Sequence, residues 1–400
     1  MVGGGPAGAA AAIRGAAAGL SVVVCDKAVF PRDKTCGDGL TAAALRLLER
    51  LGLEPARVAG WTAVHDVVMR SPSGRLVELP LPDDGLFAAV APRAALDAAL
   101  LDLAGERGAR IRPGTAIEGL ERRRDTLRAT FSAGPAVEAH YVVGADGVYS
   151  TVRKLTAPAA RSYLGEWHAF RQYFSGVADR RLWVLFEPDL LPGYAWVFPL
   201  SGGRANVGFG IPRRPGVSVR PMAALWRGLL RRPSLRAVLG DAQPEAPHRA
   251  WPIPADLSRA PLACGRVLFA GDAAGATDPM TGEGIGQALV SGILAAEAVA
   301  GDVTGNGAAD PAATGRRYAA AVEHHLGRDL RFAGMLGRVL GSPAGARGAV
   351  RAAGLTLWTR RNFARWLFED YPRALLLTPG RWHRGALSTP SAYRSTSAPF

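Results

Sequence analysis

Runs of consecutive hydrophobic residues, each ending in a glycine or an acidic residue, recur along the chain. Residues 20–26, 140–144 and 266–272 follow this pattern, which is typical of strands that are buried on both faces, as in a parallel sheet. Around them, an alanine-rich segment from Gly8 to about Ala18 and periodic segments at about 41–51, 92–103 and 286–300 predict helices. Beyond about residue 315 the chain is also predicted to be helical. The pattern therefore indicates an α/β fold with additional C-terminal helices.

A different pattern predicts a second, antiparallel sheet. Residues 64–70 and 75–81 are expected to form strands joined by a Ser-Pro-Ser-Gly turn, and three more strands are expected between Leu182 and Ile211. Tyr194, Trp196 and Phe198 are spaced by two along one of these strands, so their side chains project from one face. Such an aromatic stripe can form core or can line a cavity, and the sequence leaves both interpretations open.

The first candidate binding motif lies at the N-terminus, where Gly3-Gly-Gly-Pro-Ala-Gly8 matches G-x-G-x-x-G and Asp26 follows 18 residues after Gly8. In dinucleotide-binding units such glycines let the backbone approach a pyrophosphate, and the acidic residue binds ribose hydroxyls. Two further motifs follow predicted buried strands, namely Gly144-Ala-Asp-Gly147 and the segment that begins with Gly271-Asp272. Each motif alone is weak, because an alanine- and glycine-rich chain produces such patterns by chance and a turn explains a single aspartate.

Taken together, three longer motifs resemble the FAD-dependent hydroxylase and reductase superfamily, which is para-hydroxybenzoate hydroxylase-like, and within it the geranylgeranyl reductase family. They are Phe-Pro-Arg-Asp-Lys-Thr-Cys-Gly-Asp-Gly-Leu at 30–40, Leu-Pro-Gly-Tyr-Ala-Trp-Val-Phe-Pro at 191–199 and Gly-Asp-Ala-Ala-Gly-Ala-Thr-Asp-Pro-Met-Thr-Gly-Glu-Gly-Ile at 271–285. The resemblance covers roughly residues 2–300. It implies a Rossmann-like FAD-binding domain (1–60, 88–158 and 262–315) interleaved with an antiparallel-sheet substrate domain (61–87 and 159–261), followed by a C-terminal helical region (316–400).

The resemblance also implies a set of cofactor-binding residues. Asp272 would accept hydrogen bonds from the ribityl hydroxyls, Arg93 would lie near the phosphates, and the helix after Gly284 would aim N–H groups at the flavin pyrimidine edge. The full set is Gly3, Gly5, Pro6, Ala7, Gly8, Asp26, Lys27, Cys36, Gly37, Arg93, Asp146, Gly271, Asp272, Pro279, Gly282, Gly284 and Ile285.

Three residues are candidates for catalysis, namely Cys36, Tyr194 and Trp196. In the family the cysteine of this loop lies near the flavin, where a thiol could donate a proton to the carbon that does not receive hydride. Cys36 could equally be a small residue that packs beside the flavin ring. By resemblance, Tyr194 and Trp196 would wall a cavity for a long apolar chain.

These residues imply an FAD-dependent oxidoreductase that reduces carbon–carbon double bonds in a prenyl chain, either of a geranylgeranyl lipid or of a quinone. NADPH is a candidate electron donor, and it would dock transiently because no second G-x-G-x-x-G is present. Two alternatives remain open. One is an FAD-dependent monooxygenase, a hydroxylase or epoxidase acting on an aromatic or polyketide substrate. The other is a flavoprotein that only binds a lipid or a partner.

The distribution of charge bears on whether the protein contacts a membrane surface. The 400 residues carry a net charge of +14, of which +10 lies between residues 311 and 400. This basic region either contacts an anionic membrane surface peripherally, with Arg360, Arg361, Arg365, Trp358 and Trp366 as anchors, or is a solvated helical face. No nucleic-acid-binding motif accompanies it, so no nucleic-acid partner is expected.

Cysteine usage and the chain ends complete the picture. Three cysteines without a pairing pattern suit the cytoplasm, no transmembrane span is predicted, and no C-x-x-C, H-E-x-x-H or G-x-S-x-G motif supports a metal site or a serine hydrolase. Only Met1 and Val2 precede the glycine motif, where a strand of about five residues is expected. We therefore expect the natural start to lie upstream, and the chain as written to hold flavin less tightly than an extended one.

Overall fold

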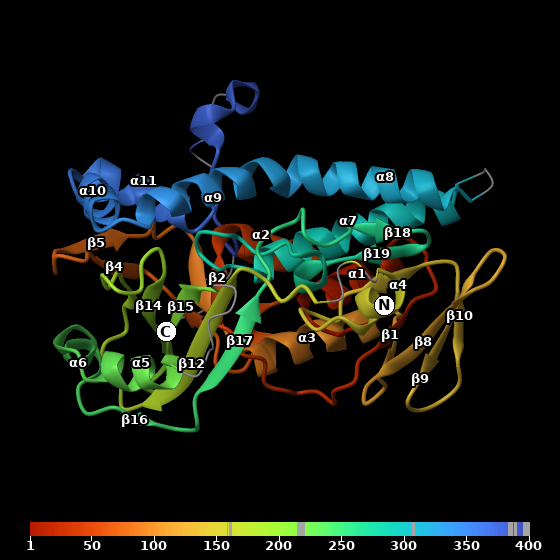
Figure 1. Ribbon diagram of the computed structural model, residues 1–400, viewed down its shortest axis with the longest axis horizontal. Coiled ribbons are helices and arrows are strands. Elements are labelled where there is room, and N and C mark those ends of the chain that lie inside the picture. Colours follow the sequence, from red (N-terminus) through yellow and green to blue (C-terminus); the bar gives the residue numbers. More distant parts are fainter. Residues whose placement is uncertain are drawn as a thin grey trace.

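In the computed structural model, the described residues are 1–157, 159, 162–213, 221–305, 309–382, 387 and 390–394. Parts of the expected substrate and C-terminal regions, at 160–161, 214–220, 383–386 and 395–400, lie outside them. Two sheet-containing halves lie along the long axis of the molecule, and helices from the C-terminal part cover one side of both (Figure 1). The predicted α/β fold with C-terminal helices is confirmed.

The first half is built on a parallel sheet. Three of its strands are the buried centres of the predicted hydrophobic runs: β1 (Val23–Cys25), β11 (Val142–Gly144) and β19 (Val267–Phe269). The fourth, β7 (Arg110–Arg112), follows the helix at Arg93–Glu106 and pairs with β1. Val2 lies between β1 and β11, with parallel bridges to Cys25 and Gly144. Hairpin strand β18 (Ala263–Cys264) adds an antiparallel edge.

Helices cover this parallel sheet and hold the loops at its carboxyl end. They are α1 (Pro6–Ala17), α2 (Ala42–Leu51), α3 (Arg93–Glu106), α4 (Thr151–Thr156) and α7 (Ile285–Val303). Helices α1 and α7 cross closely at Gly292, where a Cβ atom would lie only 2.1 Å from the carbonyl oxygen of Ala7. A small sheet of β8 (Ile117–Arg122), β9 (Leu127–Phe131) and β10 (Val137–Ala139) forms the outer end of this half, on the right of Figure 1.

The second half contains an eight-stranded sheet. Its order is β16 (Gln243–Pro244), β12 (Trp167–Ser175), β15 (Arg204–Pro212), β14 (Tyr194–Leu200), β13 (Leu182–Leu185), β4 (Asp66–Arg70) and β5 (Leu76–Pro80), and β17 (Arg249–Ile253) also pairs with β12. Neighbouring strands are antiparallel except β4 and β13, which are parallel. The sheet is antiparallel as expected, apart from this one pair, whose strands are far apart in sequence and are not joined by a hairpin.

The two faces of this sheet are covered by different parts of the chain. Helices α5 (Pro221–Leu230) and α6 (Pro233–Leu239) bury one face, with Trp226 packed against Phe170 and Phe209. The opposite face packs against the C-terminal helices α10 (Pro343–Ala353) and α11 (Leu357–Leu367). A short sheet of β2 (Gly39–Thr41), β6 (Ala88–Val90) and β3 (Thr62–Ala63) links the two halves.

The C-terminal helices begin with a long rod along the top of Figure 1. Helix α8 (Pro311–Val322) continues through a π-helical turn at Glu323–Gly327 into α9 (Arg328–Leu340). After α11 the chain returns to the body of the protein, where Ala392 bridges Leu86. Among the described residues, no helix combines the length and the apolar character needed to cross a membrane.

Candidate active site

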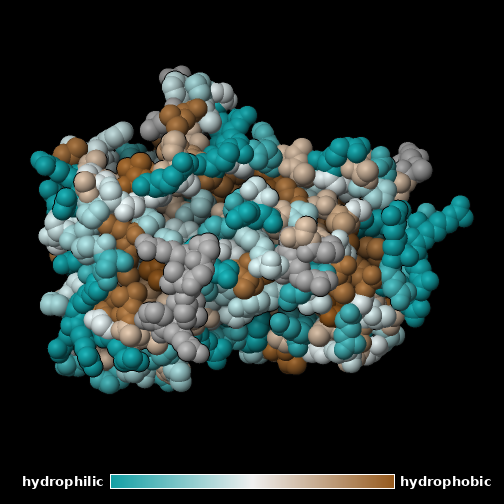
Figure 2. All heavy atoms as spheres, viewed as in Figure 1, coloured by the Kyte–Doolittle hydropathy of each residue, from teal (hydrophilic) through white to brown (hydrophobic). Residues whose placement is uncertain are grey.

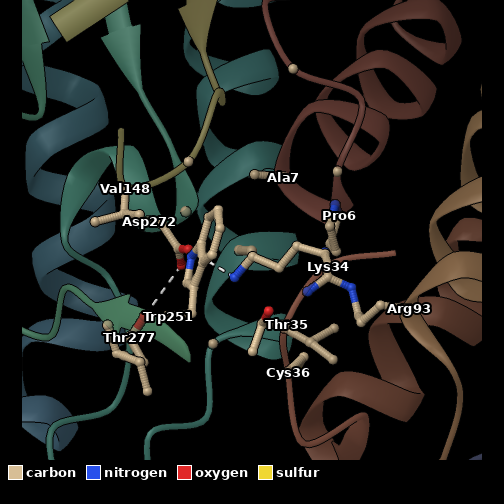
Figure 3. A pocket seen from close by; sticks show the side chains of 18 of the residues that line it. Pro6, Ala7, Lys34, Thr35, Cys36, Arg93, Val148, Trp251, Asp272 and Thr277 are labelled. Atoms are coloured by element: carbon tan, nitrogen blue, oxygen red, sulfur yellow. Dashed lines mark hydrogen bonds and ion pairs between the residues drawn. The ribbon is translucent and has the colours of Figure 1, made fainter. Parts of the chain in front are cut away.

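A cavity of about 390 Å³ lies where the carboxyl ends of β1, β11 and β19 meet the second sheet. This is the edge at which α/β sheets bind their ligands, and the volume is within the range of cofactor sites. Figure 3 shows side chains from distant segments converging on it. The cavity is lined by most of the expected residues: Gly3, Gly5, Pro6, Ala7, Asp26, Lys27, Cys36, Gly37, Arg93, Asp146, Tyr194, Trp196, Gly271, Asp272, Gly282, Gly284 and Ile285.

Two expected residues do not line this cavity. Gly8 lies beneath the glycine loop, where a Cβ atom would be 1.8 Å from the carbonyl oxygen of Gly3. Pro279 lies instead beside Gly334 of α9. Gly8 therefore supports the loop by close packing, and neither residue is in contact with the cavity.

The glycine loop is held in place by its own backbone and by Asp26. Gly3 has φ +101°, and a Cβ atom there would lie 2.3 Å from the carbonyl oxygen of Ala145, so only glycine fits. The Asp26 carboxylate accepts hydrogen bonds from the backbone N–H groups of Gly4 (2.6 Å) and Ala28 (2.8 Å). The N-terminus of α1 has no side-chain cap, which leaves its N–H groups available to an anion.

Two guanidinium groups lie beside this helix N-terminus. Both Arg93 and Arg32 bind the fully buried carboxylate of Asp97, at 2.7–2.8 Å and 2.7 Å respectively. A Cβ atom at Gly5 would be 3.6 Å from Arg32 and 3.9 Å from Arg93. Burial lowers the pKa of Arg93, but Asp97 raises it by more, so Arg93 stays charged. Two cations thus share one anion, which leaves a positive charge for a phosphate ligand.

Sequence reasoning missed Arg32 and Asp97. Arg32 lies within the cysteine-loop motif at 30–40, and Asp97 lies one helical turn after Arg93. The i, i+4 spacing on a predicted helix was a usable signal for the pair.

On the opposite wall, Asp272 lies in the loop that follows β19. It forms an ion pair with Lys34 (3.3 Å), whose side chain reaches across the cavity, and it is within 3.5 Å of the Thr277 hydroxyl (Figure 3). The Lys34 ammonium group lies 5.4 Å from the ring centre of Trp251, a cation–π arrangement. Asp146 instead caps α4, accepting hydrogen bonds from the Ser150 hydroxyl and from the N–H groups of Thr151 and Val152.

The loop carrying Cys36 is fixed by a buried hydrogen-bond network. Asn206 donates to the carbonyl oxygen of Cys36 and to the carboxylate of Asp38, both at 2.8 Å, and accepts from Trp196 Nε1 at 3.0 Å. The hydroxyl of Tyr173 donates to the same carboxylate at 2.6 Å. Asp38 itself has φ +65°, a conformation that most residues avoid. Trp196 thereby positions the loop in addition to lining the cavity.

Glycines allow this loop to lie directly against the aromatic face. Cβ atoms at Gly37 and Gly39 would lie 3.3 and 3.2 Å from the ring of Phe198. Burial raises the pKa of the Cys36 thiol, with Arg93 opposing it in part, so the thiol is protonated at neutral pH. Burial also raises the pKa of Asp38 to about 6.

A second cavity, of about 520 Å³, adjoins the first and is almost entirely apolar. It lies between the second sheet and helices α9–α11. Its apolar walls include Met69, Leu182, Val184, Phe186, Phe332, Leu336, Leu340, Val350, Trp358, Phe363, Trp366 and Leu367. Six residues line both cavities: Gly39, Tyr194, Phe198, Met280, Thr281 and Glu283. The aromatic stripe on β14 is therefore a cavity wall as well as core, and Tyr194 and Phe198 stand where the two spaces meet.

A cluster of ionisable groups lies at this junction. The buried guanidinium of Arg373 forms ion pairs with Asp278 (3.0 Å) and Glu369 (3.3 Å). Glu283 accepts hydrogen bonds from the N–H groups of Ile285 and Gly286 at the start of α7. Burial and the charge of Glu369 raise the pKa of Glu283 to about 8. None of these four residues was among the expected site residues. Arg373 and Glu369 come from the C-terminal segment and carry no local motif, whereas Asp278 and Glu283 lie inside the motif at 271–285.

Comparisons with known proteins find an FAD-binding family, reductases of prenylated compounds and a similar crystal structure. The family described as "FAD binding domain" matches residues 1–322. A menaquinone reductase of Mycolicibacterium smegmatis is 34% identical over 349 residues, which cover 80% of each chain. A digeranylgeranylglycerophospholipid reductase of Methanopyrus kandleri is 30% identical over 329 residues, 74% of this chain and 78% of that protein. The crystal structure of a geranylgeranyl bacteriochlorophyll reductase-like protein from Thermoplasma acidophilum superimposes with a TM-score of 0.78, covering 94% of this chain and 96% of that one at 22% identity.

Proposed function

The chain belongs to the geranylgeranyl reductase family of FAD-binding flavoproteins, and from this premise we propose that it saturates carbon–carbon double bonds in the prenyl chain of a lipid or quinone. Relatives that match most of its length are reductases whose names specify menaquinone and digeranylgeranylglycerophospholipid. Experiment has to decide whether the substrate of this chain is a prenylated quinone or a geranylgeranyl lipid.

The first cavity fits FAD. An uncapped helix N-terminus with two arginines that share one aspartate suits a pyrophosphate. We propose that Gly5, Pro6, Arg32 and Arg93 hold the phosphates, that Asp26 binds the ribose, and that Asp272 with Lys34 binds the ribityl chain. The glycines at 282 and 284 would let the backbone approach the ring closely.

Reduced FAD, when bound, supplies a hydride. The protein's part is to place a double bond beside it and to exclude water, and the apolar second cavity serves both purposes. Tyr194 is anchored by a hydrogen bond from its hydroxyl to the carbonyl oxygen of Thr281, and burial raises its pKa further above its usual value, so it stays protonated. Cys36, also protonated, borders the first cavity.

The observation that carries the substrate assignment is the apolar cavity that meets the flavin cavity at Tyr194, Phe198 and Glu283. Its walls contain few polar groups, which suits a polyprenyl chain and disfavours a polar aromatic or polyketide substrate. We propose NADPH as the electron donor. It would dock transiently, because the chain has one G-x-G-x-x-G motif and FAD would occupy it.

We further propose peripheral contact with an anionic membrane through helices α9–α11. Leu357 and Trp358 are each 67% exposed, and Trp358 also lines the apolar cavity, so it stands at the mouth. Hydrophobic and hydrophilic residues are interspersed over this region (Figure 2). Exposed arginines nearby are Arg338, Arg347, Arg351 and Arg361.

Two of the five expected anchors do not belong to this surface. Arg365 is paired with the buried Asp370, and the indole N–H of Trp366 donates to the carbonyl oxygen of Arg373 at 3.2 Å. Both face inward because α11 packs that side against the second sheet.

Vesicle binding tests the membrane contact. Replacing both exposed leucines, Leu355 and Leu357, by serine should weaken binding to anionic phospholipid vesicles about thirtyfold or more, since burial of each leucine side chain in the membrane contributes roughly 1 kcal/mol or more. Val29→Ser, equally exposed but outside these helices, should leave binding unchanged. Equal binding of all three proteins would contradict the proposed surface.

The proposed activity is tested by comparing prenyl lipids and quinones of cells with and without this gene by mass spectrometry. A gene-dependent gain of two hydrogens in one prenylated species is expected. A gain of one oxygen would instead establish a monooxygenase, and no change in any prenylated species would contradict the proposal in that host.

A further inference from the structure

The junction between the two cavities is the place where a double bond and a reduced flavin would meet, so a proton donor should be found there. Of the six residues that line both cavities, only Glu283 and Tyr194 carry an ionisable group. Cys36 lines the first cavity but not the second. The hydroxyl of Tyr194 is already committed to the carbonyl oxygen of Thr281, which leaves Glu283 as the better-placed acid.

The charge balance around Glu283 favours its protonated form. Three carboxyl groups, those of Asp278, Glu369 and Glu283, lie close enough to the guanidinium of Arg373 to act on its charge. Asp278 and Glu369 both form ion pairs with this cation, whereas among the described residues Glu283 has none. Burial raises the pKa of Glu369, but Arg373 lowers it in part, as do the hydrogen bonds that Glu369 accepts from Thr41 (3.0 Å) and Gln287 (2.9 Å).

The hydrogen bonds of Glu283 leave one oxygen atom free. Its Oε1 atom accepts from Ile285 (2.9 Å) and Gly286 (3.2 Å) at the N-terminus of α7. Within the described residues, no hydrogen bond involves Oε2. Glu283 lines both cavities, so a protonated Oε2 is available to donate a proton to a substrate there while Oε1 keeps its hydrogen bonds to α7.

We propose that the Glu283 carboxyl group delivers the proton that completes reduction of the substrate double bond. This inference rests on the proposed function. The hydride that reduced FAD supplies carries two electrons and adds to one alkene carbon. The proton from Glu283 Oε2 adds to the other carbon, and the π bond is lost. Reduced FAD is oxidised, Glu283 becomes a carboxylate, and solvent returns a proton to it in the next cycle.

The assignment predicts a definite pH dependence. The pKa of Glu283 is raised to about 8 by burial and by Glu369, so the carboxyl group is protonated at neutral pH. The groups that face it are Tyr194 from β14, Asp278 from its own loop, and Glu369 and Arg373 from the segment after α11. Saturation of the substrate should therefore slow about tenfold per pH unit above this value.

Glu283→Gln is the sharpest variant, because the amide oxygen can still accept from Ile285 and Gly286 while the acidic proton is lost. Enzyme reduced with dithionite is mixed without oxygen with geranylgeranyl diphosphate or with menaquinol carrying an unsaturated side chain, and saturation is followed by mass spectrometry of quenched samples. E283Q should saturate about a hundredfold more slowly or worse, within the range of general-acid effects, and should lose the pH dependence near 8. Glu297→Gln, an exposed glutamate on the same helix, should behave as wild type.

A second readout needs no turnover. Infrared spectra of the apoprotein at pH 7 should contain a protonated carboxylic acid band that is absent from E283Q and present in E297Q. Unchanged saturation by E283Q, or loss of the pH dependence in Cys36→Ser instead, would overturn the role of Glu283. Wild-type enzyme that saturates neither substrate would overturn the proposed function itself, and this inference with it.

Discussion

Asn206 connects the Cys36 loop to the aromatic face, and its removal gives a quantitative test of the site. The residue is fully buried and makes three hydrogen bonds, to the indole of Trp196, the backbone of Cys36 and the carboxylate of Asp38. Asn206→Ala leaves the Trp196 N–H group buried without a partner, at a cost of about 1–3 kcal/mol, and removes a bond to a charged group that contributes about 1.5–3 kcal/mol. We expect the free energy of unfolding to fall by about 3–5 kcal/mol.

The assay is urea unfolding of the apoprotein, followed by tryptophan fluorescence, together with equilibrium dialysis of FAD. Because the released loop lines the cofactor cavity, FAD should also bind more weakly to the variant. Gln243→Ala is the control: this side chain is exposed and, within the described residues, donates only to the carbonyl oxygen of Asp241, so its effect should stay within about 0.5 kcal/mol. A loss below 1 kcal/mol for Asn206→Ala, with unchanged FAD affinity, would refute the idea that this network holds the loop.

Two further predictions concern Asp38 of the same network and the glycine loop at the N-terminus. The pKa of Asp38 is raised from 3.8 to about 6 by burial, so wild-type stability should fall as pH rises from about 4 to 6, by about 3 kcal/mol in total. Asp38→Asn should remove that slope and be the more stable protein at pH 8; urea unfolding at pH 5 and 8 measures this, and parallel slopes would contradict it. Gly8→Ala should abolish FAD binding, since its Cβ atom would lie 1.8 Å from a backbone oxygen, whereas Gly228→Ala in α5, with no atom within 4 Å, should raise stability by about 0.5–1 kcal/mol. FAD titration and thermal unfolding of both variants measure the contrast, and full FAD binding by Gly8→Ala would count against the close packing of the loop.

The sequence was sufficient to predict the parts that depend on local pattern. Short apolar runs became β1, β11 and β19 because a strand buried on both faces requires consecutive hydrophobic residues. The glycine loop, Asp272 and Cys36 were predicted because each lies in a motif, and the cavity brings them together. Their individual roles in binding and catalysis, and the domain boundaries, remain predictions.

Other features depended on contacts between segments that carry no local signal. Asn206 and Asp38 are 168 positions apart, so nothing in either segment indicates that they bond. The same holds for Arg373, which reaches Asp278 from the C-terminal segment. The basic region was predicted to be helical, but only the fold reveals that α9–α11 close one side of an apolar cavity while also exposing hydrophobic residues.

A single-turnover experiment shows most directly whether this protein adds hydride and a proton across a prenyl double bond. Purified protein, loaded with FAD and reduced with dithionite, is mixed without oxygen with menaquinol or with a digeranylgeranyl lipid, and the products are weighed by mass spectrometry. We expect a gain of two hydrogens located in the prenyl chain, in an amount that matches the flavin oxidised. An unchanged prenyl chain with both substrates, or incorporation of oxygen when air is admitted, would contradict it.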